Sequence, residues 1–345
     1  MAVVMAMGII TQGVLTNFFS SGDISIYGKL LSIVNISLWI SFLFSLLLSI
    51  QNKQFRHIHY ENPINRFGIG TWIAGTSVCS ILIYKNFPEW LLLVEWLTIL
   101  NAFLWMTYII ISIIAIRDIY RLDLTKKVHG ILLLTTVSTQ SLVLLLNTVF
   151  KSERVFYINV SLLLVGIMFY LVCVSLILNR YLRNLTSFNI EVDWNNTNCI
   201  LHGAVSITGL ACIFSNAVHD SIIAFLWIIS AATFLVVELI EIYRFFKRIK
   251  RYGVSEGIFI YDVSQWSRIF TFGMFYTFTY KSYTGTGLLS KIQSPVIHIG
   301  VWVILSLIMI EILLSVREIL SNYQMNRMRM KGIAYSNISP VKEDF

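Results

Sequence analysis

The sequence predicts an all-α integral membrane protein with ten transmembrane helices. Its 345 residues are 57% hydrophobic and only 13% charged, and the mean hydropathy is +0.74. A soluble domain carries roughly 25% charged residues, because its surface faces water. A chain with about half that fraction cannot cover a globule with polar side chains, so we expect most of it to lie in lipid.

Each crossing is expected to be a helix of about 20 predominantly apolar residues, because lipid cannot satisfy free backbone hydrogen-bonding groups. Ten segments fit this requirement: 1–19, 28–50, 66–84, 89–116, 128–149, 155–179, 198–217, 221–243, 265–284 and 296–316. The first and ninth are shorter or contain more polar atoms than the others. We expect a transmembrane pore domain over residues 1–320 and a cytoplasmic C-terminal tail over 321–345.

Lys and Arg residues follow a strict alternation between the connections that join these helices. Nineteen of the 26 lie in segments 51–66, 117–127, 180–197, 244–265 and 317–345. The alternate connections carry only Lys85, Lys151, Arg154 and Lys291. Because cytoplasmic loops are enriched in Lys and Arg, we expect a multi-pass protein of the plasma membrane with both termini in the cytoplasm. The same rule explains most of the net charge of +8, so no nucleic-acid partner is expected.

Small residues concentrate in the odd-numbered predicted helices, which hold nine of the eighteen glycines, whereas the even-numbered helices hold three. Close packing of small residues is one explanation, but it does not favour every second helix. The alternation is better explained by five helical hairpins around a central pore, with odd helices inside and even helices outside, facing lipid.

The odd helices contain hydroxyl side chains but no Asp or Glu. Cation pathways and proton relays normally contain buried carboxylates, so this lining favours an anion. The candidate pore-lining residues are Gly8, Thr11, Gly70, Thr71, Gly75, Thr135, Thr139, Gly203, Ser206, Gly209, Gly273 and Thr277. Lys281 and Arg268, near the two ends of the ninth helix, are the candidates for attracting an anion.

The ninth predicted helix is unusually aromatic. Phe270 shares a helical face with Gly273 and Thr277, three and seven residues further along. A phenyl ring over small residues in a pore would act as a plug, and ordinary core or lipid-facing packing is the alternative interpretation. The four cysteines lie in apolar stretches without paired or metal-type spacing, so we expect neither a disulfide nor a metal site.

Three segments, taken together with the ten helices, resemble the tellurite-resistance/dicarboxylate transporter family of TehA-like proteins and plant slow anion channels. The segments are Asn62–Gly70, His202–Ser206 and Trp266–Phe275, the last reading Trp-Ser-Arg-Ile-Phe-Thr-Phe-Gly-Met-Phe. The resemblance implies five hairpins around a pore in each subunit, a homotrimer, and anion conduction occluded by a ninth-helix phenylalanine. Phe270 matches that residue best, and Phe272 is the alternate. The proline that relatives often carry after it is Thr271 here.

We therefore expect an anion channel for chloride- or nitrate-like ions, with tellurite or sulfite as further possibilities. Its expected partners are small inorganic or organic anions, membrane lipids and further copies of the chain; we expect no cofactor and no enzymatic activity. The nearest alternative is a proton-coupled carrier of dicarboxylate, sulfite or tellurite, for which His129 and His202 would be the titrating groups. A haem protein with these two histidines as ligands and a receptor are more distant alternatives.

Overall fold

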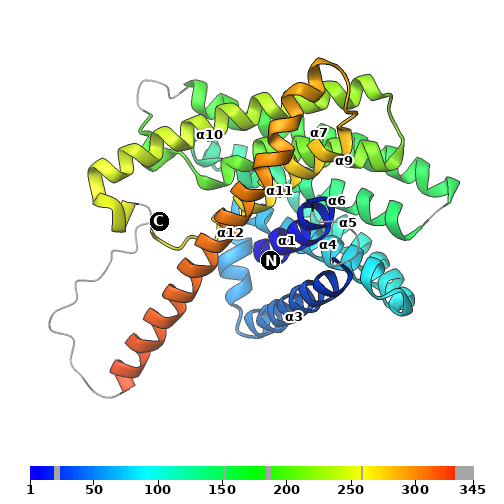
Figure 1. Cartoon of the computed structure of the whole chain (residues 1–345). Coiled ribbons are helices and arrows are strands. Elements are labelled where there is room, and N and C mark those ends of the chain that lie inside the picture. The colour runs from blue at the N-terminus through cyan, green and yellow to red at the C-terminus, as the bar shows by residue number, and fades with distance from the viewer. Residues whose placement is uncertain (19–23, 151, 184–187, 258, 331–345) are drawn as a thin grey trace.

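A computed structural model describes residues 1–18, 24–150, 152–183, 188–257 and 259–330, and all regular structure within these ranges is helical. The all-α class is therefore confirmed. The α-helices are α1 (Ala2–Ile9), α2 (Thr16–Phe18), α3 (Ile24–Gln51), α4 (Gly70–Asn86), α5 (Leu91–Arg121), α6 (Leu134–Val149), α7 (Glu153–Arg183), α8 (Ile190–Asp193), α9 (Ile200–Ser215), α10 (Asp220–Gly257), α11 (Gln265–Ser282) and α12 (Gly287–Met330). Figure 1 shows their arrangement.

Eight helices of the described chain are long and apolar enough to cross a membrane, namely α3, α4, α5, α6, α7, α9, α10 and α12 with their flanking turns. The first predicted span forms a shorter apolar helix, Ala2–Phe18, with a π-helical stretch at Ile10–Leu15 between α1 and α2. The ninth corresponds to α11, an 18-residue helix whose charged ends and many Thr, Ser and Tyr residues lower its hydropathy. A helix enclosed by other helices does not need the apolar surface of one that faces lipid.

Five helices pack in a closed cycle of neighbours at the centre of the molecule. α1 contacts α4, α4 contacts α6, α6 contacts α9, α9 contacts α11, and α11 returns to α1. In Figure 1 these five helices lie in the middle of the molecule. We call them the inner helices, and they correspond to the odd-numbered predicted spans.

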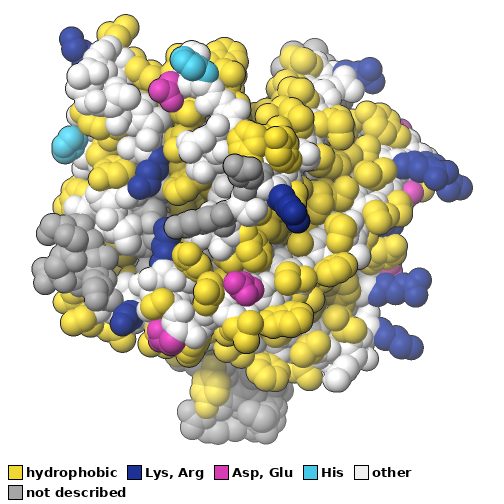
Figure 2. Space-filling view, turned by 90° about the vertical axis from the view of Figure 1, so that its right-hand side faces the viewer, with side chains coloured by type: hydrophobic (Ala, Val, Ile, Leu, Met, Phe, Trp, Pro, Cys, Tyr) yellow, Lys and Arg dark blue, Asp and Glu magenta, His cyan; other side chains and the backbone are white. Residues whose placement is uncertain are grey.

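The other five long helices lie against the outside of this cycle. α3 contacts α4 and α1, α5 contacts α4 and α6, α7 contacts α6 and α9, α10 contacts α9 and α11, and α12 contacts α11. In the most apolar stretch of α4, α6 and α9, between 72% and 83% of residues are buried, against 6% to 39% in the five outer helices. Figure 2 shows apolar side chains over a broad area of one outer face. Such a surface is suited to lipid.

The last predicted span differs from the structure at its start. α12 begins at Gly287, before the predicted span, and includes Pro295 within the helix. The helix continues as far as Met330, beyond residue 320, and the division into a pore domain and a tail stays a prediction. The remaining residues of the predicted tail, 331–345, lie outside the described residues.

Candidate ion pathway

A cavity of about 630 Å³ lies where the five inner helices begin. Every inner helix contributes residues from its first turn or the turn before it: Met1 and Ala2 for α1; Gly68, Ile69, Thr71 and Trp72 for α4; Ile131 and Leu134 for α6; Thr197 and Ile200 for α9; Val263, Ser264 and Ser267 for α11. The end of α3 and the segment after it form a further wall, which includes His59. The inner helices therefore all run in the same direction away from one cavity.

The electrostatics of this cavity favour a negative ion. A helix N-terminus carries about half a positive charge, because its first backbone N–H groups have no partner in the helix. Five such ends meet here, and none of the described residues that line the cavity is acidic. Hydroxyls of Thr71, Thr197, Ser264 and Ser267 belong to the same lining. Thr71, Thr197 and Ser264 donate their protons to Gly68 O, Asn195 Oδ1 and Asp262 Oδ1. Among these four hydroxyls that of Ser267 has no acceptor in the described structure, and a weak donor of this kind holds an ion without trapping it.

Phe270 lies directly beyond this cavity along α11. Ser267 lines the cavity, and Phe270 and Met274 follow it three and seven residues later. Residues at these spacings share one face of a helix. Phe270 is 2% exposed and Met274 is 1% exposed, so both side chains are enclosed by protein.

The faces of α11 on either side of Phe270 are occupied by the neighbouring inner helices. The contacts are Gly273 with Ile9 and Thr277 with Gly13 on the side of α1, and Thr271 with Gly203 and Phe278 with Gly209 on the side of α9. Because α1 and α9 flank α11 in the cycle, the face between them turns toward the interior of the ring. Phe270 occupies that face.

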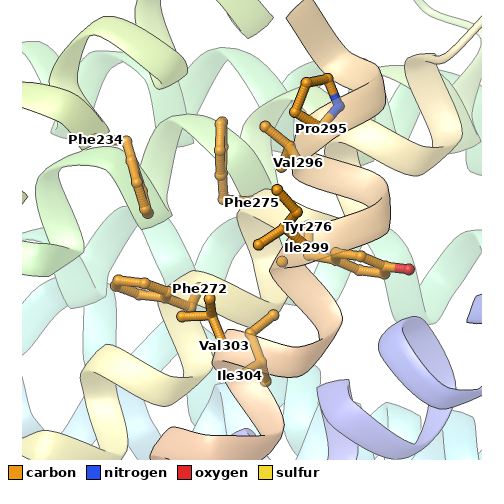
Figure 3. Close-up of a pocket in the computed structure, with 10 residues that line it drawn as sticks. Phe234, Phe272, Phe275, Tyr276, Pro295, Val296, Ile299, Val303 and Ile304 are labelled. Carbon is orange, nitrogen blue, oxygen red and sulfur yellow. The ribbon is translucent and has the colours of Figure 1, made fainter.

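The alternate residue, Phe272, lies on the opposite side of α11. Its ring centroid is 4.9 Å from that of Phe234 on α10. Phe272 also lines an apolar pocket of about 280 Å³ between α10, α11 and α12, shown in Figure 3. The side chain therefore points to the outer helices, so the geometry favours Phe270 as the residue that could close a central pathway.

Most glycines among the predicted pore-lining residues are points of close helix contact. Gly203 and Gly209 lie against Thr271 and Phe278 of α11, and Gly8 lies against Val78 of α4. A Cβ at Gly70 would lie 2.6 Å from the Tyr108 hydroxyl, one at Gly75 2.8 Å from Met1 Cε, and one at Gly273 2.8 Å from Ile9. These glycines let the helices approach each other, as small residues do between transmembrane helices.

The predicted hydroxyl-bearing residues hydrogen-bond within their own helices or to outer helices. Thr11, Thr71, Thr135, Thr139, Ser206 and Thr277 all donate to carbonyl oxygens three or four residues earlier. Thr139 also accepts from Trp105 of α5 at 2.9 Å, and Ser206 lies 2.7 Å from Ser230 of α10. Thr139 and Ser206 thus face outer helices, whereas Thr71 lies at the cavity.

Arg268 is held by acidic residues of α10. Its Nη2 lies 2.7 Å from Glu241 Oε1, and both side chains are largely buried. The same carboxylate accepts a hydrogen bond from Trp194 Nε1 at 2.8 Å and lies 3.5 Å from Arg244 Nη1. The charge of Arg268 is thus largely balanced in place, and this cluster anchors the start of α11, two residues before Phe270.

Lys281 lies at the far end of α11, exposed, with Nζ 5.7 Å from the centre of the Tyr280 ring. Ser267 and the connection between Arg268 and Glu241 were not predicted from the sequence. The seven-residue spacing from Ser267 through Met274 to Lys281 was available as a signal of one continuous face. No local pattern connects Arg268 to Glu241, because the two residues lie on different helices.

The inner helices form a closed cycle with an acid-free cavity at one end, an arrangement suited to an anion. The family model described as SLAC1, voltage-dependent anion channel, matches residues 1–316, and the chain belongs to this family. The resemblance drawn from the three sequence segments is therefore confirmed, and the protein is a membrane anion channel and not an enzyme. No curated protein matches the chain.

Proposed function

We propose that small anions cross this protein through the centre of the five inner helices and that Phe270 closes the pathway. The observation that carries the proposal is the convergence of five helix N-termini on one acid-free cavity, with Phe270 next along the same face of α11. An ion that passes a buried phenyl ring must give up its water without receiving polar partners, and this desolvation is costly. Displacing the ring would remove that barrier.

In this proposal the segment Ala2–Phe18 and α11 also cross the membrane, which completes ten crossings as five hairpins. Their position between outer helices supports this, because α3 and α12 cover them in part. The Lys- and Arg-rich segments 51–66, 117–127, 180–197 and 244–265 precede α4, α6, α9 and α11 at the end with the cavity. By the positive-inside rule, that end faces the cytoplasm.

We propose chloride and nitrate as the main permeant ions, with tellurite and sulfite as the further anions to test. Helix N-termini and the Ser267 hydroxyl, without a Lys or Arg among the described lining residues, suit small monovalent ions, which must bind and leave quickly. We further propose a plasma-membrane location and a trimer in which each subunit has its own pore, both on family resemblance.

A second candidate is proton-coupled transport, which one feature of the site favours. His202 is fully buried, and its Nε2 lies 3.8 Å from Glu238 Oε1. Neither ring nitrogen of His202 has a hydrogen-bond partner in the described structure. A buried His beside a carboxylate is a group that could carry a proton through a transport cycle.

Flux measurements on the purified protein in liposomes distinguish these functions. With the membrane potential clamped and no pH gradient, a channel passes chloride or nitrate at a rate that follows the voltage. A coupled carrier is silent under these conditions and takes up anion only when a proton gradient is imposed. Uptake that requires the pH gradient and disappears in His202→Gln would contradict the channel proposal.

A further inference from the structure

The five inner helices also end together, at the side of the ring opposite the cavity. They run parallel, so their C-termini, each with about half a negative charge, lie at that end. Together these ends amount to about −2.5 elementary charges, a field that would repel the ion that the other end attracts. An anion pathway along this axis therefore needs positive charge at the far end.

Two inner helices supply such charge in their last turns. Lys85 lies in the last turn of α4 and Lys281 in the last turn of α11. The corresponding turns of α2, α6 and α9 have no basic residue. Both lysines are exposed, and neither forms an ion pair within the described part of the chain. Desolvation is the larger influence on the Lys85 ammonium group, and the positive charge of Lys281 acts on it as well. This end of the ring therefore holds positive charge without a counter-ion among the described residues.

Both lysines continue the faces of α4 and α11 that line the cavity. Thr71 and Ser267 line it, and Lys85 and Lys281 follow them by fourteen residues each. Two seven-residue steps rotate the direction of a side chain by only about 40° and advance it by about 21 Å along the axis. Val78 and Met274, the midpoints of these two stripes, are both buried.

We propose that Lys85 and Lys281 together form the anion-attracting site at the C-terminal mouth of the pathway, where they offset the negative ends of the inner helices. Small inorganic anions, chloride and nitrate among them, are the ligands. The inference rests on the proposed pathway through the ring. It assigns one function to two residues that lie on different helices, 196 positions apart in the sequence.

A purely structural explanation also exists, since a Lys in the last turn of a helix stabilises that helix through its dipole. The two explanations make different predictions. A dipole contribution appears as a change in thermal stability in each single variant. An anion site appears as a loss of anion current that depends on ionic strength, because salt screens exposed charges.

The first test uses Phe270→Ala as a conducting background in planar bilayers. Lys85→Gln, Lys281→Gln and the double variant are compared with Lys250→Gln, an exposed lysine on the outer helix α10 at the opposite end of the ring. At about 0.1 M chloride, where the screening length is about 10 Å, the double variant should lose several-fold of the current of anions entering from this mouth. At about 1 M, where the length is about 3 Å, the loss should disappear. An unchanged current at the lower salt, or an equal loss at both, would overturn the proposal.

A second measurement does not depend on conduction. A single cysteine introduced as Tyr283→Cys, two residues beyond Lys281, reports the local potential through its rates of reaction with anionic and cationic thiol reagents. The four native cysteines are buried. The anionic reagent should react faster, and Lys85→Gln should reduce that preference, whereas Lys250→Gln at the opposite end of the ring should leave it unchanged. If Phe270→Ala carries no anion current, the proposed pathway fails, and the cysteine assay alone then tests whether Lys85 and Lys281 form one anion-attracting site. A preference for the anionic reagent that Lys85→Gln leaves intact would refute that site.

Discussion

Glu241 on α10 balances the buried charge that anchors α11. It is 8% exposed, and its carboxylate contacts Arg268 at 2.7 Å and Trp194 at 2.8 Å, with Arg244 at 3.5 Å. Glu241→Gln keeps the shape of the side chain but removes its charge. Arg268 would then remain in a largely buried position with only Glu238 near enough to attract it.

The size of this effect follows from the burial of the pair. Removing one partner of a buried ion pair costs about 3–5 kcal/mol, because the other charge stays desolvated. Glu238 attracts Arg268 as well, so we expect the lower end of that range, about 3 kcal/mol. A surface ion pair contributes about 0–1 kcal/mol. Arg251 with Glu191 is the less buried pair for comparison, at 2.9 Å with the Arg251 side chain 54% exposed and the Glu191 side chain 14% exposed.

Reversible unfolding in mixed micelles compares Glu241→Gln with Glu191→Gln, which removes the carboxylate of the less buried pair, on the same scale. Glu241→Gln should lower the free energy of unfolding several times more than Glu191→Gln does. The double variant Glu241→Leu with Arg268→Met should recover part of the loss, because it removes the unpaired charge of Arg268. The recovery should be incomplete, because buried Arg244 also loses the Glu241 carboxylate and keeps only its hydrogen bond to Asn196 Oδ1 at 2.6 Å. Equal losses in Glu241→Gln and Glu191→Gln would refute the assignment of Arg268 to a buried, balanced cluster.

Two further predictions concern packing and pH. Gly209→Ala would place a Cβ into the Phe278 ring and should cost about 1–3 kcal/mol of unfolding free energy. Gly68→Ala meets only an ordinary contact at 3.8 Å and should be tolerated, so equal losses would contradict the packing of α9 on α11. Burial holds the pKa of His59 at the cavity below its usual range. Its imidazole is therefore neutral at pH 7, and acidification should add positive charge and raise anion current. Burial also lowers the pKa of the Met1 α-amino group, which lines the same cavity, to about 6, so the increase should become smaller in His59→Asn without disappearing. An increase of the same size in His59→Asn would contradict a contribution from His59.

Much of the fold could be predicted from composition and spacing. The apolar stretches marked the eight long helices, because lipid-facing residues must be apolar along most of their length. The distribution of glycine separated inner from outer helices, and contacts such as Gly203 with Thr271 show the physical reason. Helices at the centre of the cycle approach closely, and only small residues permit this.

The orientation of individual side chains was harder to predict. Thr139 and Ser206 were expected at the centre, but Trp105 and Ser230 show that these two hydroxyls face outer helices. An inner helix has hydroxyls on several faces, and the sequence alone does not show which face a neighbouring helix covers. For the same reason, the choice between Phe270 and Phe272 required the position of α10.

Charge partners were the least predictable part of the site. Arg268 was expected to attract an anion, and its pairing with Glu241 depends on the packing of α10 against α11. The role proposed for Lys85 depends equally on geometry, since only the closed cycle places the ends of α4 and α11 at one mouth. Sequence spacing identifies neighbours within a helix, but not between helices.

The most direct test of the proposed pathway compares Phe270→Ala with Phe272→Ala in liposomes under a clamped membrane potential. Each variant removes one phenyl group from α11. Phe270→Ala removes it from the face toward the centre of the inner helices, and Phe272→Ala removes it from the face toward α10. The proposed pathway predicts large anion-selective flux in Phe270→Ala and flux near the wild-type level in Phe272→Ala. Equal flux in the two variants, or a larger flux in Phe272→Ala, would contradict a central pore closed by Phe270.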